Sequence, residues 1–148
     1  MIKQVITKEI EIDIGHRIPN HESKCRNPHG HRLRVEVGVY GEVINKKGAS
    51  DEGMVIDFGD IKKIMIEEID IKHDHGFMIS DTDEIMLKAF DKMIKEAYKI
   101  IIVPFIPTTE NICRHFYNLL KPKFKKKNIK IKYVKIWETP TSSAFYEE

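Results

Sequence analysis

Cysteine is scarce in this 148-residue chain, which contains only Cys25 and Cys113. Two thiols do not form a disulfide framework, so we expect a protein of the reducing cytoplasm. Long apolar runs are also missing, which argues against a membrane-spanning helix. Charged residues are interspersed through Ile2–Ile14, a pattern that does not resemble a signal peptide. We therefore predict no membrane partner.

An excess of charge of one sign is absent as well. The 25 Lys and Arg residues nearly balance the 23 Asp and Glu residues, which leaves a net charge of +2. This balance gives no reason to expect a nucleic-acid partner. Lysines do crowd the segment 121–132, where we expect a solvated loop and hairpin, with a polyanion site as the weaker alternative. Stacking aromatics are not interleaved with these lysines.

The order of the expected elements predicts an α+β fold in a single domain, residues 1–148. Two strands, a set of helices and two further strands favour a four-stranded antiparallel sheet with helices packed on one face. Exposed sheet edges then predict an oligomer. The expected strands cover Ile2–Ile14, His31–Val43, Ile129–Glu138 and Ser143–Tyr146, with a short buried strand at Ile100–Phe105 and a loop or short strand at Asp74–Ser80. The expected helices follow a cap at Asp57, span Asp83–Tyr98, and run from Thr109 to just before Pro122.

Three histidines fall on the apolar faces of the first two strands. His16 continues an alternation of isoleucines, and His29 and His31 are in phase with the apolar positions of the second strand. Because residues i and i+2 share a face of a strand, neighbouring strands would bring the three imidazoles together. Imidazole ligands favour zinc, and three ligands with an open position are typical of a catalytic site.

Cys25 lies in a polar loop between Lys24 and Arg26, an environment that favours a thiolate. We interpret it as a catalytic base or nucleophile, with a fourth metal ligand as the alternative. Asp74 and His75 form an acid–imidazole pair that can support proton transfer, although the neighbouring His73 is also a candidate ring.

Glu138 follows two buried positions at period two, which places a carboxylate on an apolar face at the end of a strand. A buried carboxylate needs a partner, either a lysine of this chain or a ligand with two adjacent N–H donors. Thr108 and Thr109 stand at a predicted helix start, where hydroxyls and free backbone N–H groups are available.

Together these motifs resemble the 6-pyruvoyl-tetrahydropterin synthase / 6-carboxy-tetrahydropterin synthase family over nearly the whole chain. The order and spacing of the motifs are specific, although no single one is. The chain departs from the shortest members between His75 and Pro107, where about thirty residues with an extra helix replace a short loop. The matching motifs are His16-Arg17, Cys25-x-x-x-His29-Gly-His31, Gly53-Met-Val-Ile-Asp57-Phe58, Asp74-His75, Pro107-Thr-Thr-Glu110-Asn111 and Glu138-Thr139.

The resemblance implies a tunnelling fold (T-fold), in which subunits join their sheets into a barrel. It also implies a homo-hexamer, a dimer of trimers, with active sites between subunits. The implied substrate is a small pterin triphosphate, 7,8-dihydroneopterin triphosphate, and the implied cofactor is Zn²⁺.

The resemblance further implies a role for each candidate residue. The zinc ligands would be His16, His29 and His31. The catalytic residues would be Cys25, as the base, with Asp74 and His75 as its relay. The pterin would be bound by Glu138, with Thr108 and Thr109 nearby. Arg17, Lys24 and Arg26 are candidates for the triphosphate by position alone.

Two products are compatible with these motifs. A carboxy enzyme would release acetaldehyde and triphosphate and form 6-carboxy-5,6,7,8-tetrahydropterin for queuosine (7-deazapurine) biosynthesis. A pyruvoyl enzyme would eliminate triphosphate from the same substrate. We favour the carboxy enzyme, the commoner branch among small microbial-looking chains. A non-catalytic binding module, with Cys25 closing a four-ligand zinc site, is the rival from another class.

Overall fold

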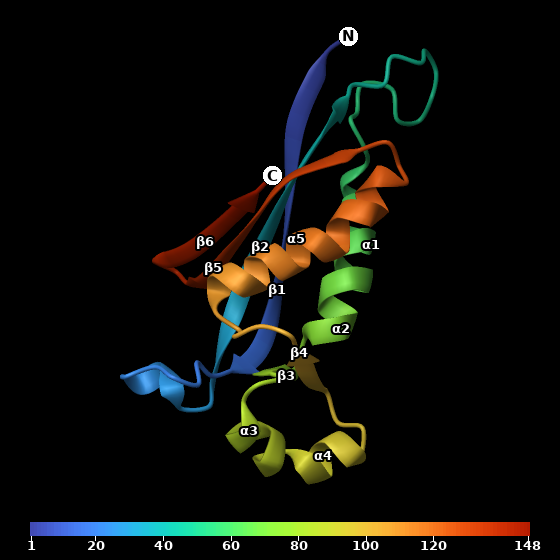
Figure 1. The fold of residues 1–148 in the computed structure, drawn as a ribbon. Coiled ribbons are helices and arrows are strands. Elements are labelled where there is room, and N and C mark those ends of the chain that lie inside the picture. Colours follow the sequence, from blue (N-terminus) through green and yellow to red (C-terminus); the bar gives the residue numbers. More distant parts are fainter.

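A long antiparallel hairpin forms the centre of the fold (Figure 1). The computed structural model describes residues 1–148. Strands β1 (Lys3–His16) and β2 (His29–Glu42) pair along their whole length, from Lys3 opposite Glu42 to His16 opposite His29. The strict alternation of apolar and polar residues fixes this register, because a slip by one residue would turn the apolar set towards solvent.

The sheet has six strands, so the prediction of four was wrong. Strands β5 (Lys130–Thr139) and β6 (Ser142–Glu147) continue the antiparallel part beyond β2, as expected. Two short strands, β3 (Gly76–Ser80) and β4 (Ile100–Val103), extend the sheet beyond β1 in parallel, which gives the order β4-β3-β1-β2-β5-β6. Their short apolar runs carry too little periodicity to reveal the pairing. Strand β4 is an edge strand with Ile102 47% exposed, rather than the buried strand expected.

Helices cover one face of the antiparallel sheet (Figure 1). They are α1 (Phe58–Met65), a π-helical turn η2 (Ile66–Asp70), α2 (Ile71–His73) and α5 (Thr109–Lys125). Asp57 caps α1 by accepting a hydrogen bond from the Gly59 N–H at 2.6 Å. Helix α5 continues through Pro122, where we expected it to have ended. Leu120 and Phe124 on either side are fully buried, and their packing offsets the missing N–H.

The segment expected to form one helix from Asp83 to Tyr98 forms two short ones, α3 (Glu84–Ala89) and α4 (Asp91–Lys95). The chain leaves helical geometry at Phe90, whose φ and ψ are −95° and 7°. The Phe90 ring packs against Phe77 of β3 at 5.1 Å between centroids. This contact explains the break, because it draws Phe90 onto the sheet. Both helices lie beside β3 and β4, away from α1 and α5 (Figure 1).

The core lies between the antiparallel sheet and the helices that cover it. Its largest members, such as Phe116 and Phe124 of α5, are fully buried in one apolar cluster with Val35 and Val37 of β2. The lysine-rich segment is partly neutralised, since Lys123 pairs with the buried Glu68 at 2.9 Å. No helix is long and apolar enough to cross a membrane.

His73 at the end of α2 makes the fold sensitive to acid. It is 3% exposed, its Nδ1 lies 2.8 Å from the Ile69 carbonyl, and its ring packs on His115 and Phe116. Burial lowers the pKa of His73 to about 4. Since an unfolded histidine titrates near 6.5, protons favour the unfolded state as the pH falls from about 6.5 towards 4.

We therefore expect a His73→Phe variant to show a shallower loss of stability with acid. The stabilisation from neutral His73 is complete above about pH 6.5 and falls by up to about 3 kcal/mol near pH 4. Urea unfolding at pH 7.5, 6 and 5, with wild type and variant both free of metal, measures the two slopes. Equal slopes would show that His73 does not carry this acid sensitivity.

Candidate metal centre and catalytic groups

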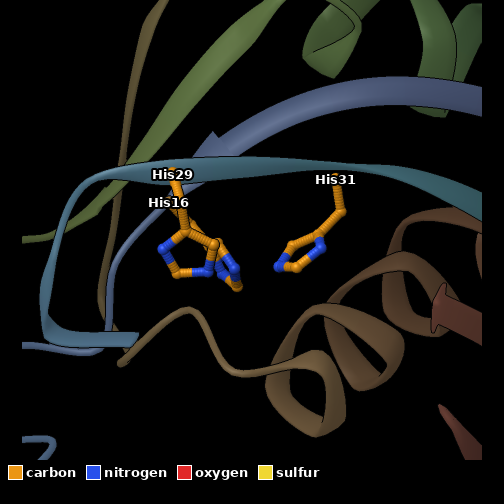
Figure 2. Close-up of side chains that lie close together, drawn as sticks. All are labelled: His16, His29 and His31. Atoms are coloured by element: carbon orange, nitrogen blue, oxygen red, sulfur yellow. The ribbon is translucent and has the colours of Figure 1, made fainter. Parts of the chain in front are cut away.

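Three imidazoles converge at one end of the β1–β2 hairpin (Figure 2). His16 is the last residue of β1 and pairs with His29, the first residue of β2, while His31 lies two residues further on the same face. One nitrogen of each ring lies within 4.8 Å of the others. Figure 2 shows all three rings on the same side of the hairpin, towards the segment that leads into α5. Strand periodicity therefore brings together the three predicted ligands.

Backbone carbonyls fix the tautomers of two of these rings. Nδ1 of His16 lies 2.7 Å from the Pro107 carbonyl, and Nδ1 of His29 lies 2.7 Å from the Asn27 carbonyl. A carbonyl only accepts, so each Nδ1 carries the proton and each Nε2 keeps a free lone pair. Metal-bound histidines are held in this way by partners outside the ligand set.

Two of the ring nitrogens in this cluster are buried without a hydrogen-bond partner. Nε2 of His16 and Nε2 of His31 make no hydrogen bond, which is costly unless another group binds there. Burial is the main cause that lowers the pKa of both rings, so both are neutral at pH 7. Three imidazoles whose ring nitrogens lie within 4.8 Å of one another fit a zinc ion.

Glu138 approaches the same group of histidines from β5. Its Oε1 lies 3.6 Å from Nε2 of both His16 and His31, beyond hydrogen-bond distance. A register shift between Trp137 and Thr139 accompanies the end of the strand. The side chain is 28% exposed, so the expected buried carboxylate is only half-buried, and no lysine pairs with it. The lysine partner is thereby ruled out within the chain, and the binding of a ligand's N–H donors by Glu138 stays a prediction.

The start of α5 lies against the histidine cluster. Thr108 is the N-cap of this helix and accepts a hydrogen bond from the Asn111 N–H at 3.2 Å. Thr109 begins the helix, and both threonines are half-buried. Because the Pro107 carbonyl contacts His16, the backbone just before the two threonines lies beside the histidine cluster. A role for them in pterin binding stays a prediction.

Cys25 lies outside the histidine cluster. It occupies a short turn, η1 (Lys24–Arg26), as a free, half-buried thiol, and it is not among the groups within 4.8 Å of one another. The arrangement does not form the closed four-ligand site of a structural zinc module. Cys113, by contrast, is buried under β5 with a pKa raised by burial to about 12, as an inert filler would be.

Asp74 and His75 form a second polar group. Oδ2 of Asp74 lies 2.6 Å from Nδ1 of His75, and Oδ1 accepts the Asp13 N–H at 2.8 Å. The backbone hydrogen bond from Asp13 is the largest cause that lowers the pKa of Asp74. His75 adopts a positive φ of 59° and its side chain is 78% exposed. The carboxylate thus orients an accessible imidazole.

This second group includes a side chain on the face of the sheet away from the three histidines. His75 lies within 4.8 Å of the Asp13 and Asp74 carboxylates, and it lines a cleft to which Asp13, Arg32 and also His31 contribute. Asp13 of β1 and Arg32 of β2 are paired with each other, and their side chains are in contact. Asp13 precedes Ile14, which faces the helices. Because successive side chains of a strand alternate between faces, Asp13 and Arg32 point away from the helices. Within one chain, Asp74 and His75 therefore form a group with Asp13 that is distinct from the group of His16, His29 and His31.

Sequence reasoning missed an ion pair beside Cys25. Arg17, a positional candidate for the triphosphate, donates from Nε and Nη2 to the two carboxylate oxygens of Asp83, both at 2.6 Å. Its Nη1 donates to the Arg26 carbonyl at 3.1 Å. With these donors engaged, Arg17 is poorly placed to bind phosphate. No sequence pattern signals the pair, since 66 residues separate its members.

Residues 5–148 match the family described as 6-pyruvoyl tetrahydropterin synthase. The chain is similar to a 6-carboxy-5,6,7,8-tetrahydropterin synthase of Haemophilus influenzae, with 35% identity over 143 residues that cover 97% of this chain and 98% of the relative. It is also similar to relatives of the same name from Rickettsia felis and Aquifex aeolicus. Their identities are 36% and 33%, over 90% and 99% of this chain and 93% and 99% of theirs.

Solved structures share the fold. A structure of an uncharacterized protein from Wolinella succinogenes aligns with a TM-score of 0.79 and 25% identity, over 100% of this chain and 99% of that one. The Caenorhabditis elegans 6-pyruvoyl tetrahydropterin synthase aligns with a TM-score of 0.71 and 23% identity, over 100% and 97%. At this identity the second alignment establishes only a common fold.

Proposed function

The chain belongs to the 6-pyruvoyl tetrahydropterin synthase family, and from this membership we propose that it is a zinc-dependent 6-carboxy-5,6,7,8-tetrahydropterin synthase. The observation that carries the proposal is the convergence of His16, His29 and His31 with two buried, unpartnered nitrogens. Relatives of that name match nearly the whole chain at 33–36% identity, and this similarity supports the carboxy product.

His16, His29 and His31 would hold Zn²⁺. His16 and His29 would bind the ion through Nε2, because a backbone carbonyl engages Nδ1 of each of these two rings. The chemistry supplied by the bound ion would be Lewis-acid polarisation of the substrate's side-chain oxygens, which acidifies the adjacent C–H groups. The low pKa values of His16 and His31 favour the neutral ligand form at pH 7.

We assign proton abstraction to Cys25 and the relay to Asp74 and His75. The Asp74 carboxylate holds His75 by Nδ1, which leaves Nε2 of an exposed ring free to exchange a proton. Glu138 would bind the pterin, because two adjacent N–H donors match a carboxylate that has no cationic partner in the chain. Thr108 and Thr109 would line the same subsite.

The active site would be completed by a second chain. Asp74 and His75 group with Asp13, whose side chain points away from the three imidazole rings, and we propose that Asp74 and His75 of a neighbouring chain reach Cys25. We propose a homo-hexamer, a dimer of trimers, with sites between subunits, as the family resemblance implies. Both cysteines are free thiols, which agrees with the expectation of a cytoplasmic protein in queuosine biosynthesis.

Product analysis tests the proposed function. The zinc-loaded protein is incubated with 7,8-dihydroneopterin triphosphate, the pterin is identified by mass spectrometry, and acetaldehyde is assayed. We expect 6-carboxy-5,6,7,8-tetrahydropterin with an equal amount of acetaldehyde. A pyruvoyl pterin without acetaldehyde would favour the alternative synthase, and no turnover would contradict both reactions.

A further inference from the structure

The turn that carries Cys25 is anchored by the two residues that follow His16. The Ile18 N–H donates to the Cys25 carbonyl at 2.8 Å, and Nη1 of Arg17 donates to the Arg26 carbonyl at 3.1 Å. One carbonyl belongs to the cysteine itself and the other to the next residue. The position of the thiol therefore depends on how firmly the chain after β1 is held.

Asp83 determines the direction of the Arg17 side chain. The pair is bidentate, with both N···O distances at 2.6 Å, and Asp83 is buried. Because the guanidinium is planar, hydrogen bonds from Nε and Nη2 to one carboxylate also fix the direction of Nη1. In Arg17, Nη1 points towards the Arg26 carbonyl. Asp83 is itself fixed as the cap of α3, because it accepts the Met86 N–H at 3.2 Å.

We propose that Arg17 is a positioning residue for Cys25 and that Asp83, from the segment inserted between His75 and Pro107, orients it. The inference rests on the proposed function, in which Cys25 is the catalytic base. It gives the insertion a role in the reaction, since the cap of α3 is connected to the cysteine turn through a single guanidinium. A lysine has one ammonium and cannot hold both partners in this geometry.

Loss of this contact should act on turnover rather than on binding. A base must lie within hydrogen-bond reach of the proton that it removes, and a displacement of about 1 Å can cost about 100-fold in rate. Substrate affinity would depend on Glu138 and on the metal, which Arg17 does not contact. The expected signature is a lower kcat with little change in KM.

The test compares Arg17→Lys and Asp83→Asn with the wild-type holoenzyme. Asparagine is as good an N-cap as aspartate, so Asp83→Asn keeps α3 capped while it removes the charge. We expect kcat to fall on the order of 10- to 100-fold in both variants, KM to change by less than about two-fold, and the zinc content to be unchanged. Asp91→Asn, which breaks the exposed Lys95–Asp91 pair in α4, is the matched control and should leave kcat unchanged.

Hydrogen exchange provides a readout that general destabilisation would not mimic. In both variants, peptides spanning residues 17–27 should exchange about tenfold faster, because the amides of the cysteine turn lose their anchor. Peptides from the core of β1 and β2 should be unchanged. Unaltered exchange in this turn, or faster exchange throughout the protein, would overturn the proposal.

The two hypotheses fail in different ways. If wild type turns over and Arg17→Lys keeps its kcat, the positioning role is wrong while the proposed function stands. If wild type does not turn over, the proposed function has failed, and the exchange rates alone decide whether Arg17 and Asp83 hold the turn.

Discussion

A His31→Ala variant is expected to lose its zinc and nearly all of its turnover. The ring contributes one of only three imidazoles in the cluster, and its Nε2 is buried with no partner in the chain. Alanine leaves two ligands, too few for a stable site. Lewis-acid assistance is worth several kcal/mol at the transition state, so we expect kcat to fall at least about 1000-fold.

Metal analysis after exhaustive dialysis measures the first effect, and the product assay measures the second. His75→Ala is the matched control for zinc content, since it removes an exposed imidazole outside the group of three histidines. It should keep about one zinc per chain, as wild type does. If His31→Ala retained stoichiometric zinc, the assignment of the three ligands would be wrong.

This site could be predicted from the sequence because it depends on the simplest periodicity in the chain. Side chains two residues apart share a face of a strand, and the apolar alternation of β1 and β2 sets their register. His16 and His29 are thereby directly paired, and His31 follows on the same face. The order and spacing of all the motifs together indicate the family, which the comparisons confirm.

The features of the fold that the sequence did not predict depend on contacts between distant segments, and these contacts leave no periodic pattern in the sequence. The pairing of β3 with β1 involves only Ile14–Gly15 opposite Gly76–Phe77, too short to leave a pattern. The break between α3 and α4 follows from the packing of one ring against the sheet. The Arg17–Asp83 pair joins two residues that are far apart in the chain, and neither residue belongs to a sequence pattern that would predict the contact.

Mixing two inactive variants is expected to restore activity. Cys25→Ala removes the proposed base and His75→Ala removes the relay ring, and neither touches the three histidines. Each alone should keep its fold and zinc but lose about 100- to 10,000-fold in turnover. If Cys25 and His75 of different chains share a site, randomly mixed oligomers will contain both native groups in about a quarter of their sites.

The experiment co-expresses the two variants with different tags, purifies oligomers that carry both tags, and compares their turnover per chain with wild type. Oligomers of two differently tagged Cys25→Ala chains are the control and should stay inactive. If Cys25→Ala alone lost its zinc, the thiol would be a metal ligand rather than a base.

The mixed oligomer distinguishes the two possible origins of the active site. Asp74 and His75 group with Asp13, whose side chain points to the face of the sheet away from the three imidazole rings. A site within one chain would need these groups to meet across the sheet, and mixing would then restore nothing. Recovery near a quarter of the wild-type rate requires a neighbour to bring the relay to the cysteine.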